Sequence, residues 1–519
     1  TKMAIRLVPD CYAASNENGW WDDEHWQMHG QGNFRANSQG LWFEDEEWRK
    51  KDDVKIKHHY IEPYETTAKW AGAVTALGGI PLTYFQTATR SIDYVEKFPE
   101  HMLFNESHHK IDMNQVRNFI RGKDYDKSYD GDLSNSWNWQ NKSCTSYDFT
   151  DKDFRAHIQD VYKNLNDGGV RGLMYDYAAN GWALFGGMDD KYATAGSAYR
   201  AIFQLARDGL GKDAYLHERN LQIGSDITLG IVSSQRIWGD TDIATPNMIS
   251  RGGLRWYKNR VVVGYDMDAK NLLKALPNND DGLHKLLTMS YTAGSRLLLA
   301  NSFSTLEQKH IFALSRIFPY HSSPLTARPV DMLTNNYPRV YSFRINKDWQ
   351  QVVFYNQDDK NKTNISVGLS DKSIAGGLEL ESDKLYYVYD FWNKRLIGKI
   401  SGSDKLTQEL REGEARMMSI HAVENYPQVI STDRHLLQGY IELSEIEWNA
   451  VTKTLKGKAK LIENEPMTIT IATNGFKLTK TDSENASSST TTKNNLLELI
   501  LKNQKSGETS WKISFEKLQ

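Results

Sequence analysis

Short apolar runs recur along residues 3–301, separated by helical stretches or long connections. Among the helical stretches, residues 153–165 carry their apolar side chains at the spacing of a helix. Strands that alternate with helices form a parallel sheet, and eight such units in succession are typical of a (β/α)8 barrel. The runs cover residues 3–8, 55–61, 80–86, 171–177, 213–218, 231–240, 260–266 and 296–301. The sequence therefore predicts an α/β fold with a (β/α)8 TIM barrel over residues 1–328.

The pattern changes after Pro329. Apolar and polar residues alternate in several later stretches, among them 340–356 and 415–423, and turns separate these stretches. Such alternation is typical of half-buried antiparallel strands. The sequence predicts a C-terminal antiparallel β-sandwich region over residues 329–519, built as one module or as two small β modules. Ser, Thr and Asn dominate residues 481–495, which predicts a mobile polar loop there.

Composition narrows the classes of partner. The formal net charge of −3 over 519 residues gives no electrostatic basis for binding nucleic acid or an anionic membrane. No stretch approaches the roughly 18 apolar residues of a membrane-spanning helix. His58 and His59 are adjacent and would point to opposite sides of a strand, so no metal site is predicted, and no cofactor is expected. The chain opens on a strand-like run, as a mature or a trimmed chain would, so the sequence does not determine the localisation; if the chain is a mature form, a periplasmic or secreted protein is favoured over a cytoplasmic one.

A polar residue stands at the end of each predicted parallel strand. In a (β/α)8 barrel the carboxyl ends of the strands meet at one face, and this face holds the active site. Five of the eight residues are carboxylates, more than the ordinary polarity of loops explains. The eight residues are Asp10, Tyr60, Gln86, Asp176, Glu218, Asp240, Asp266 and Asn301. We interpret them as the rim of a catalytic site.

Asp176 ends the run Arg171-Gly-Leu-Met-Tyr-Asp176, which predicts a buried strand that carries an acid at its tip. Taken alone, the same pattern fits an aspartate that caps the next helix. Cleavage of a glycosidic bond with retention requires two carboxyl groups about 5 to 5.5 Å apart, one as nucleophile and one as acid/base. Asp176 is the candidate nucleophile, and both Glu218 and Asp240 are candidates for the acid/base.

Two stretches carry a family resemblance. One runs from Tyr147-Asp-Phe-Thr-Asp-Lys-Asp-Phe154 through a helix to Gly169-Val-Arg-Gly-Leu-Met-Tyr-Asp176. The other joins Gly224-Ser-Asp-Ile-Thr-Leu-Gly230 to Gln235-Arg-Ile-Trp-Gly-Asp-Thr-Asp242. Both resemble glycoside hydrolase clan D, especially the α-galactosidases of families 27 and 36. The resemblance implies a retaining exo-α-glycoside hydrolase for α-galactosyl-type sugars, with Asp176 as nucleophile and Asp240 as acid/base.

The resemblance also implies an oligosaccharide or glycoside as the partner. The residues expected to bind the sugar include two neighbours of Asp240 and five residues at the other strand ends. They are Trp238, Asp242, Asp10, Tyr60, Gln86, Asp266 and Asn301.

Two features depart from the family 36 pattern. Met174 stands where that family places a Lys that binds sugar hydroxyls, and the fifth strand ends in His217-Glu218-Arg219-Asn220. The second feature is similar to family 129, whose acid is a glutamate on strand five. Some relatives of that family release 3,6-anhydro-D-galactose, a sugar with fewer hydroxyls that suits Met174. The alternatives are therefore an exo-α-3,6-anhydro-D-galactosidase for red-algal galactan (carrageenan) oligosaccharides and, outside the enzymes, a catalytically inactive carbohydrate-binding barrel.

Overall fold

The chain divides into two compact units, Thr1–Gly239 and Asp240–Gln519, here called the N-terminal and C-terminal units. Among the residues that the structure describes, no helix combines the length and apolar character needed to cross a membrane. The predicted strands 3–8 and 55–61 lie outside the described residues. The computed structural model describes residues 67–76, 78–87, 98–101, 103, 147–176, 188–219, 226–239, 241–275, 280–301, 303–321, 324–493 and 495–518.

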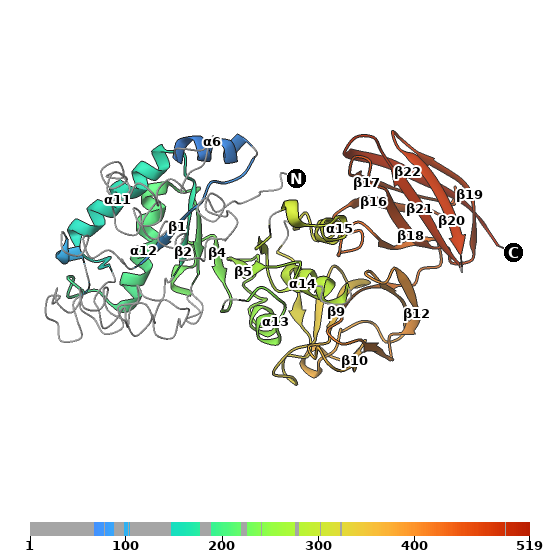
Figure 1. The fold of residues 1–519 in the computed structure, drawn as a ribbon. Coiled ribbons are helices and arrows are strands. Elements are labelled where there is room, and N and C mark those ends of the chain that lie inside the picture. The colour runs from blue at the N-terminus through green and yellow to red at the C-terminus, as the bar shows by residue number, and fades with distance from the viewer. Residues whose placement is uncertain are drawn as a thin grey trace. The chain divides into compact units, whose positions relative to one another are not determined.

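The N-terminal unit contains a parallel sheet whose strands follow one another in chain order, β1-β2-β3-β4. Helix α11 lies in the connection from β1 to β2, and helix α12 in the connection from β2 to β3 (Figure 1). The elements are α6 (Thr67–Ala76), β1 (Thr83–Gln86), η1 (Pro99–His101), α11 (Lys152–Asp167), β2 (Gly172–Asp176), α12 (Ala195–Leu210), β3 (Tyr215–Glu218), η3 (Asp226–Thr228) and β4 (Ser234–Arg236).

Helices α11 and α12 form because each has a side-chain cap and one apolar face. The Asp151 carboxylate caps α11 by accepting a hydrogen bond from the Phe154 amide at 2.7 Å, and Thr194 and Ser197 form a capping box on α12. The two helices pack closely, because a Cβ added at Gly209 would lie 2.5 Å from the Cβ of Tyr162. The helix predicted over 153–165 is confirmed.

The C-terminal unit begins with the same alternation of helices and parallel strands. Strands β5 and β6 pair in parallel, whereas the described strands from β7 onward pair antiparallel. This change confirms the predicted fold class, an α/β barrel-type fold followed by a C-terminal antiparallel β-sandwich. The elements before the change are α13 (Pro246–Gly253), β5 (Gly264–Lys270), α14 (Asp281–Thr292), β6 (Arg296–Leu299), η4 (Phe303–Thr305) and α15 (Gln308–Ser315).

The antiparallel part contains four sheets, in the orders β12-β11-β14-β9-β8-β7, β10-β13, β15-β18-β21-β20 and β16-β17-β22-β19. The first strands and one 3-10 turn are β7 (Arg328–Pro329), β8 (Val340–Arg344), β9 (Trp349–Tyr355), β10 (Thr363–Gly368), η5 (Ser373–Ala375), β11 (Leu385–Asp390), β12 (Arg395–Ser401), β13 (Lys405–Leu410) and β14 (Ala415–Ala422). The later strands are β15 (Gln428–Thr432), β16 (Leu443–Asn449), β17 (Thr454–Leu461), β18 (Met467–Ala472), β19 (Phe476–Ser483), β20 (Ser487–Lys493), β21 (Leu496–Lys502) and β22 (Gly507–Lys517).

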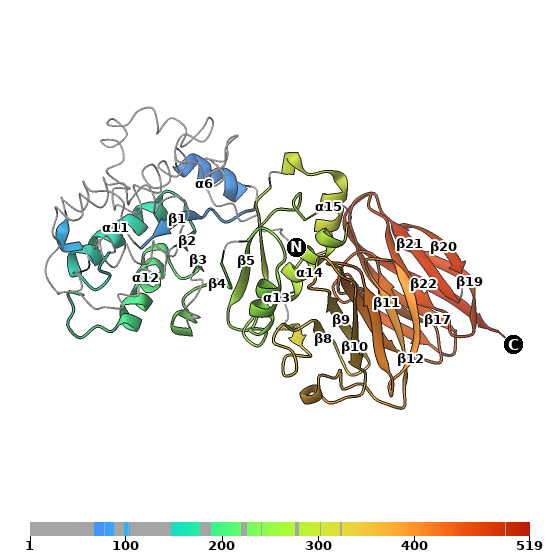
Figure 2. The ribbon, with the colours of Figure 1, turned by 60° about the horizontal axis from the view of Figure 1, so that its bottom comes forward.

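Two large apolar cores hold these sheets together, and a smaller cluster joins β11 to β15 and β18 through Tyr387, Tyr389, Ile430 and Ala472. The first includes Phe354 from the six-stranded sheet and Ile365 from the β10-β13 pair. The second includes Ile469 from one four-stranded sheet and Trp511 from the other, so these two sheets pack face to face (Figure 2). Strands β17, β21 and β22 of the second core alternate between buried and exposed side chains. Strands β8, β9 and β14 of the first core are instead buried at nearly every position, so the half-buried alternation predicted over 340–356 and 415–423 is wrong there, because both faces of this sheet are covered.

Helix α14 is joined to the antiparallel part by polar as well as apolar contacts. The guanidinium of Arg411 donates two hydrogen bonds to the Asp281 carboxylate, at 2.6 and 2.7 Å. The indole nitrogen of Trp392 donates to the hydroxyl of Thr288 at 2.9 Å. Ten of the twelve residues of α14 are buried. The helix is therefore enclosed on most of its surface.

Two predicted elements differ from the structure. Residues 481–495, predicted as a mobile loop, complete β19, turn, and form β20, because the Ser and Thr backbone pairs with β21 while most of the hydroxyl side chains face solvent. The strand predicted over 260–266 begins later, at Gly264, and extends to Lys270. Arg260 adopts a φ of 65°, and Val261 and Val262 are exposed in a turn, so the apolar triplet is not part of the strand.

Candidate active site

The carboxyl ends of β1 to β4 align at one edge of the sheet in the N-terminal unit. Asp176, the last residue of β2, pairs in register with Gln86, the last residue of β1. On the other side of β2, Tyr175 pairs with Glu218, the last residue of β3. Glu218 in turn pairs with Gln235 of β4. The side chains of Gln86 and Asp176 lie outside the described part of the structure, but their backbones end neighbouring strands.

One face of this sheet is closed by helices α11 and α12. The ring of Tyr175 packs edge-on against Phe203 of α12, with 5.2 Å between the ring centres, and its hydroxyl is hydrogen-bonded to that of Tyr162 on α11. Tyr175 is fully buried. Residues that pair in register share a face of the sheet, so Glu218 and Gln235 belong to this helix-covered face.

The Glu218 carboxylate is enclosed by hydrogen-bond donors on the helix-covered face. Its Oε1 accepts a hydrogen bond from the Tyr199 hydroxyl at 2.5 Å. Its Oε2 accepts one from the Thr228 hydroxyl at 2.5 Å and one from the Gln235 amide at 2.8 Å. Only 1% of the residue is exposed. The carboxylate thus joins α12, η3 and β4 to the end of β3 and has little room to contact a substrate.

The opposite face of the sheet carries Met174, which pairs in register with His217. Both residues are buried. The Nδ1 atom of His217 is hydrogen-bonded to the Ser234 hydroxyl at 2.7 Å, and the Tyr215 hydroxyl donates to the same Ser234 oxygen at 2.6 Å. By the alternation of a strand, position 176 belongs to the face of Met174 and not to that of Tyr175.

The segment that leads to Asp240 is fixed by an arginine. The Nε of Arg236 donates a hydrogen bond to the carbonyl of Trp238 at 2.8 Å, and Arg236 is buried. Trp238 itself is partly buried. Asp240, like Asp10 and Tyr60, lies outside the described residues.

In the C-terminal unit, β5 holds the residues that directly follow Asp240. The carboxylate of Asp268 accepts a hydrogen bond from the Thr241 amide at 3.1 Å, and the ammonium group of Lys270 donates to the Thr241 carbonyl. Asp268 has a φ of 68° at an irregularity in the register of β5, and its own amide donates to the Asp266 carboxylate at 3.0 Å. Bulges of this kind are common beside active sites because they redirect the chain.

Asp266 is the third residue of β5, which runs from Gly264 to Lys270. It lies within the strand and not at its tip, which corrects the position predicted from the sequence. It is fully buried. The polar run Gly264–Lys270 forms a strand because its carboxylates accept hydrogen bonds from nearby backbone amides, which offsets the cost of burying them.

Asp242 and Asn301 lie next to the turn that follows β5. The Asp242 carboxylate forms an ion pair with Lys274, and its carbonyl accepts a hydrogen bond from the Asn271 amide at 2.9 Å. The side chain of Asn301 accepts from the Leu272 amide at 2.7 Å and donates to the Asn271 side chain at 3.0 Å. This turn thus brings together two of the residues predicted to bind substrate.

No local sequence pattern marks the residues that surround Glu218. Tyr199 occupies an ordinary position on the apolar face of α12, and Thr228 and Gln235 are isolated polar residues. Their role depends on the register of β3 against β4, which the sequence does not encode locally. No group of three or more His, Cys, Asp or Glu side chains suited to a metal ion occurs in the described part of the chain.

No protein-family model and no curated protein matches the sequence. Solved structures that resemble the chain include a GH27 β-L-arabinopyranosidase from Geobacillus stearothermophilus, at 12% identity, covering 71% of this chain and 81% of that chain, with a TM-score of 0.49. Another is α-galactosidase I from Mortierella vinacea, at 13% identity, 68% and 79% coverage and a TM-score of 0.44. A third is the isomalto-dextranase of Arthrobacter globiformis T6, at 11% identity, 88% and 85% coverage and a TM-score of 0.47.

Proposed function

We propose that the protein is a retaining exo-α-glycoside hydrolase that acts on α-galactosyl-type sugars. The observation that carries the proposal is the position of Asp176, at the end of β2 between the ends of β1 and β3. Catalytic residues of barrel enzymes come from the carboxyl ends of parallel strands. The motifs around Asp176 and Asp240 resemble those of clan D, whose enzymes cleave α-galactosides by double displacement.

In this mechanism Asp176 attacks the anomeric carbon, and a covalent glycosyl-enzyme forms as the leaving group departs. The second carboxyl group protonates the leaving oxygen and then activates the water that releases the sugar. We assign this second role to Asp240 in preference to Glu218. A general acid must contact the leaving oxygen, whereas Glu218 is 1% exposed and already accepts hydrogen bonds from Tyr199, Thr228 and Gln235.

In this proposal the sugar hydroxyls are bound by residues at other strand ends and by the neighbours of Asp240. Asp10, Tyr60, Gln86, Trp238, Asp242, Asp266 and Asn301 stay the candidates. Asp242 and Asn301 are supported by their common attachment to the turn after β5. Asp266 is placed deeper, so its contribution would be to orient Asp268 through the hydrogen bond to the Asp268 amide.

A second candidate function is supported by Met174. Met174 pairs with His217 on the face opposite the helices, and both side chains are buried. A thioether offers no strong hydrogen bond to a hydroxyl. Met174 thus supplies no hydroxyl-binding group where family 36 places a lysine, which favours a sugar that lacks hydroxyls through an internal ether bridge, such as 3,6-anhydro-D-galactose at the end of a carrageenan oligosaccharide.

The experiment that tests both candidates measures sugar release from p-nitrophenyl α-galactoside and from carrageenan oligosaccharides that end in 3,6-anhydro-D-galactose. Proton NMR of the first-formed sugar should show the α-anomer, because two displacements restore the configuration. A β-anomer would mean inversion and would overturn the double-displacement assignment. Release from the second substrate alone would select the anhydro-galactosidase, and release from neither by a well-folded protein would favour the inactive barrel.

A further inference from the structure

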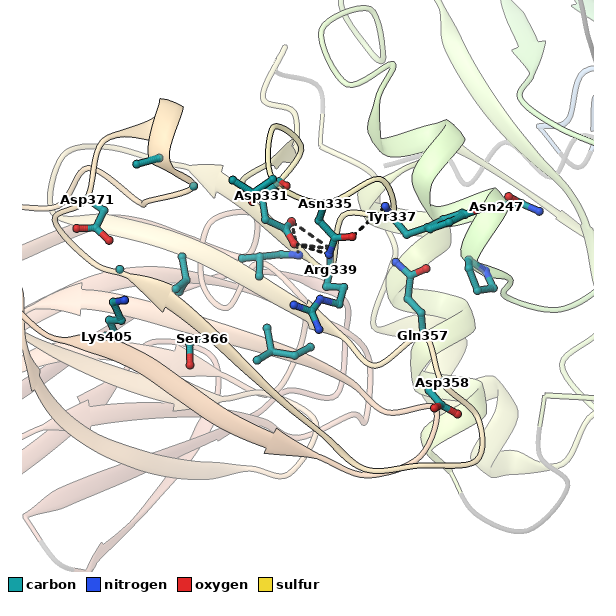
Figure 3. A pocket seen from close by; sticks show the side chains of 18 residues that line it. Asn247, Asp331, Asn335, Tyr337, Arg339, Gln357, Asp358, Ser366, Asp371 and Lys405 are labelled. Atoms are coloured by element: carbon teal, nitrogen blue, oxygen red, sulfur yellow. Dashed lines mark hydrogen bonds between the residues drawn. The ribbon is translucent and has the colours of Figure 1, made fainter.

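A cavity of about 950 Å³ opens in the antiparallel part of the C-terminal unit, and none of the candidate active-site residues lines it. We call it the sandwich groove. Five segments border it: the connection from β7 to β8, the turn after β9, strand β10 with the loop after it, the start of β13, and the start of α13 (Figure 3). The volume lies near the upper end of the range of about 300–1,000 Å³ that is typical of ligand pockets.

The connection from β7 to β8 is held rigid by Asp331. Its carboxylate accepts hydrogen bonds from the backbone amides of Arg339 and Val340, at 3.1 Å each, and from the side-chain amide of Asn335 at 3.2 Å (Figure 3). The side-chain oxygen of Asn335, Oδ1, accepts a hydrogen bond from the Tyr337 backbone amide at 3.1 Å. The loop thus presents the Tyr337 side chain, on a residue that is 49% exposed, beside the groove without needing a ligand to order it.

Two buried polar atoms of the groove lining have no hydrogen-bond partner in the described part of the protein. One is Nε of Arg339, a donor, and the other is Oε1 of Gln357, an acceptor. The Gln357 amide nitrogen donates to the Pro338 carbonyl at 2.7 Å, which fixes the orientation of the amide group. These two atoms are shielded from solvent, but the side chains of Arg339 and Gln357 are partly exposed and line the groove. A guanidinium and an amide group at one cavity favour a polar ligand.

The far end of the groove is shaped by a glycine. A Cβ added at Gly368 would lie 1.9 Å from Oδ2 of Asp371, so only glycine lets this carboxylate lie against β10. Asp371 and Lys405 lie at this end, away from Gln357 (Figure 3). The lining as a whole contains three aspartates, one arginine and one lysine. This near balance of charge gives no basis for holding a polyanion.

We propose that the sandwich groove binds a neutral oligosaccharide at a site distinct from catalysis. Sugar hydroxyls both donate and accept hydrogen bonds, so they suit a lining that contains a guanidinium group, Arg339, and an amide group, Gln357. The Tyr337 ring offers an apolar face to the C–H groups of a sugar ring, in the way that aromatic rings combine apolar contact with a polar edge. Such a site would keep the protein on a polysaccharide while the active site releases terminal sugars.

The test measures binding by the full-length protein, because binding does not depend on turnover. The probes are guar galactomannan, chemically desulfated κ-carrageenan oligosaccharides, and the sulfated parent oligosaccharides. Affinity electrophoresis and calorimetry should show binding of at least one neutral probe, with the sulfated parent bound no more tightly than its desulfated form. Tighter binding of the sulfated parent, or no binding of any neutral probe, would overturn the proposal.

Variants separate the groove from other surfaces. Arg339→Gln and Tyr337→Ala should each weaken binding of the neutral probe about ten-fold, the usual effect of losing one charged hydrogen bond or one aromatic contact. Tyr257→Ala is the matched control, because Tyr257 is similarly exposed, at 55%, and does not line the groove. Hydrolysis of p-nitrophenyl α-galactoside should stay unchanged in all three variants. Equal affinity of wild type and of an Arg339→Gln/Tyr337→Ala double variant that melts normally would exclude this site.

Discussion

The two faces of the sheet in the N-terminal unit use the same strands for different purposes. On the helix-covered face, the Tyr175 hydroxyl is hydrogen-bonded to that of Tyr162, and the Glu218 carboxylate accepts a hydrogen bond from Tyr199. These polar atoms hold the helices against the strands. On the opposite face, Met174 and His217 form a buried surface beside the position of Asp176. Residues adjacent in sequence therefore differ in role according to which face they occupy.

This difference teaches that a carboxylate at the end of a barrel strand is a candidate for catalysis only if the carboxylate itself can reach the substrate. Glu218 satisfies every general criterion for a strand-end acid except this one. Its three hydrogen-bond donors come from three different elements, α12, η3 and β4. Buried polar networks of this kind contribute to a unique packing of the elements they join.

The largest expected effect is on Asp176. Asp176→Asn should lower turnover by about four orders of magnitude, as the loss of a central catalytic residue commonly does. Its melting temperature should remain close to that of the wild type, because the replacement preserves the shape of the side chain. Circular dichroism and a release assay measure the two effects. More than a few per cent of residual activity would remove Asp176 from the role of nucleophile.

A somewhat smaller effect is expected at Asp240. Asp240→Ala should lose about 10²- to 10⁴-fold in activity on substrates with poor leaving groups, which is the usual contribution of a general acid. An activated aryl glycoside should be cleaved more readily, and azide should restore its turnover by replacing the water that needs a base. Rescue of Glu218→Ala by azide would instead make Glu218 the acid/base and would contradict its structural role on the helix-covered face.

Glu218→Ala should act mainly on stability. The change leaves the buried donors of Tyr199, Thr228 and Gln235 without their acceptor, which we expect to lower the free energy of unfolding by about 3 kcal/mol. Urea unfolding followed by fluorescence measures the change. Glu100→Ala, at an exposed glutamate in the same unit, is the control and should be neutral. A stable Glu218→Ala protein without activity would contradict a structural role.

The substitution Asp268→Asn, in the C-terminal unit, tests whether β5 positions the residue that follows Asp240. Asparagine tolerates the φ of 68° as well as aspartate does, so the backbone should be preserved. The hydrogen bond to the Thr241 amide should weaken, and the residue after Asp240 would then be held less firmly. We expect kcat to fall about ten-fold with little change in KM, since a small misplacement of a catalytic group commonly has such an effect. An unchanged kcat would show that this anchor is not needed for positioning.

The smallest effect is expected from Tyr199→Phe. This substitution removes one hydrogen bond to Glu218 and keeps the ring that packs at 5.5 Å from Phe203. The free energy of unfolding should decrease by about 1 kcal/mol, with normal activity per folded molecule. In a double-mutant cycle with Glu218→Ala, the two losses should be less than additive. Full additivity would mean that the two side chains do not interact energetically.

The sequence predicts the order and type of most elements because their signals are local. The period of α11 and the apolar run of β2 depend only on neighbouring residues, and both elements form where predicted. The face of Glu218 could not be predicted, because all four residues of β3 are buried and the usual alternation of polar and apolar residues is missing. Its environment is set by register against β4 and by α12, both of which are tertiary features.

The two misplaced elements have related causes. The prediction for residues 481–495 relied on composition, whereas β20 is determined by pairing with the apolar strand β21. The start of β5 was misjudged because Val261 and Val262 look like core residues, although they are exposed in a turn. Local apolarity indicates a strand only where a partner and a core are available, and neither is encoded in a short stretch.

The enclosure of α14 limits how the protein can be divided. The boundary predicted near residue 328 separates parallel from antiparallel strands, but the Asp281–Arg411 and Thr288–Trp392 contacts cross it. A fragment ending at residue 328 would expose the apolar side chains of a helix that is buried on nearly all sides, and aggregation is the expected fate of such a surface. In evolution, too, the two parts should have been inherited together, because recombination at this boundary would separate a helix from its main packing partner.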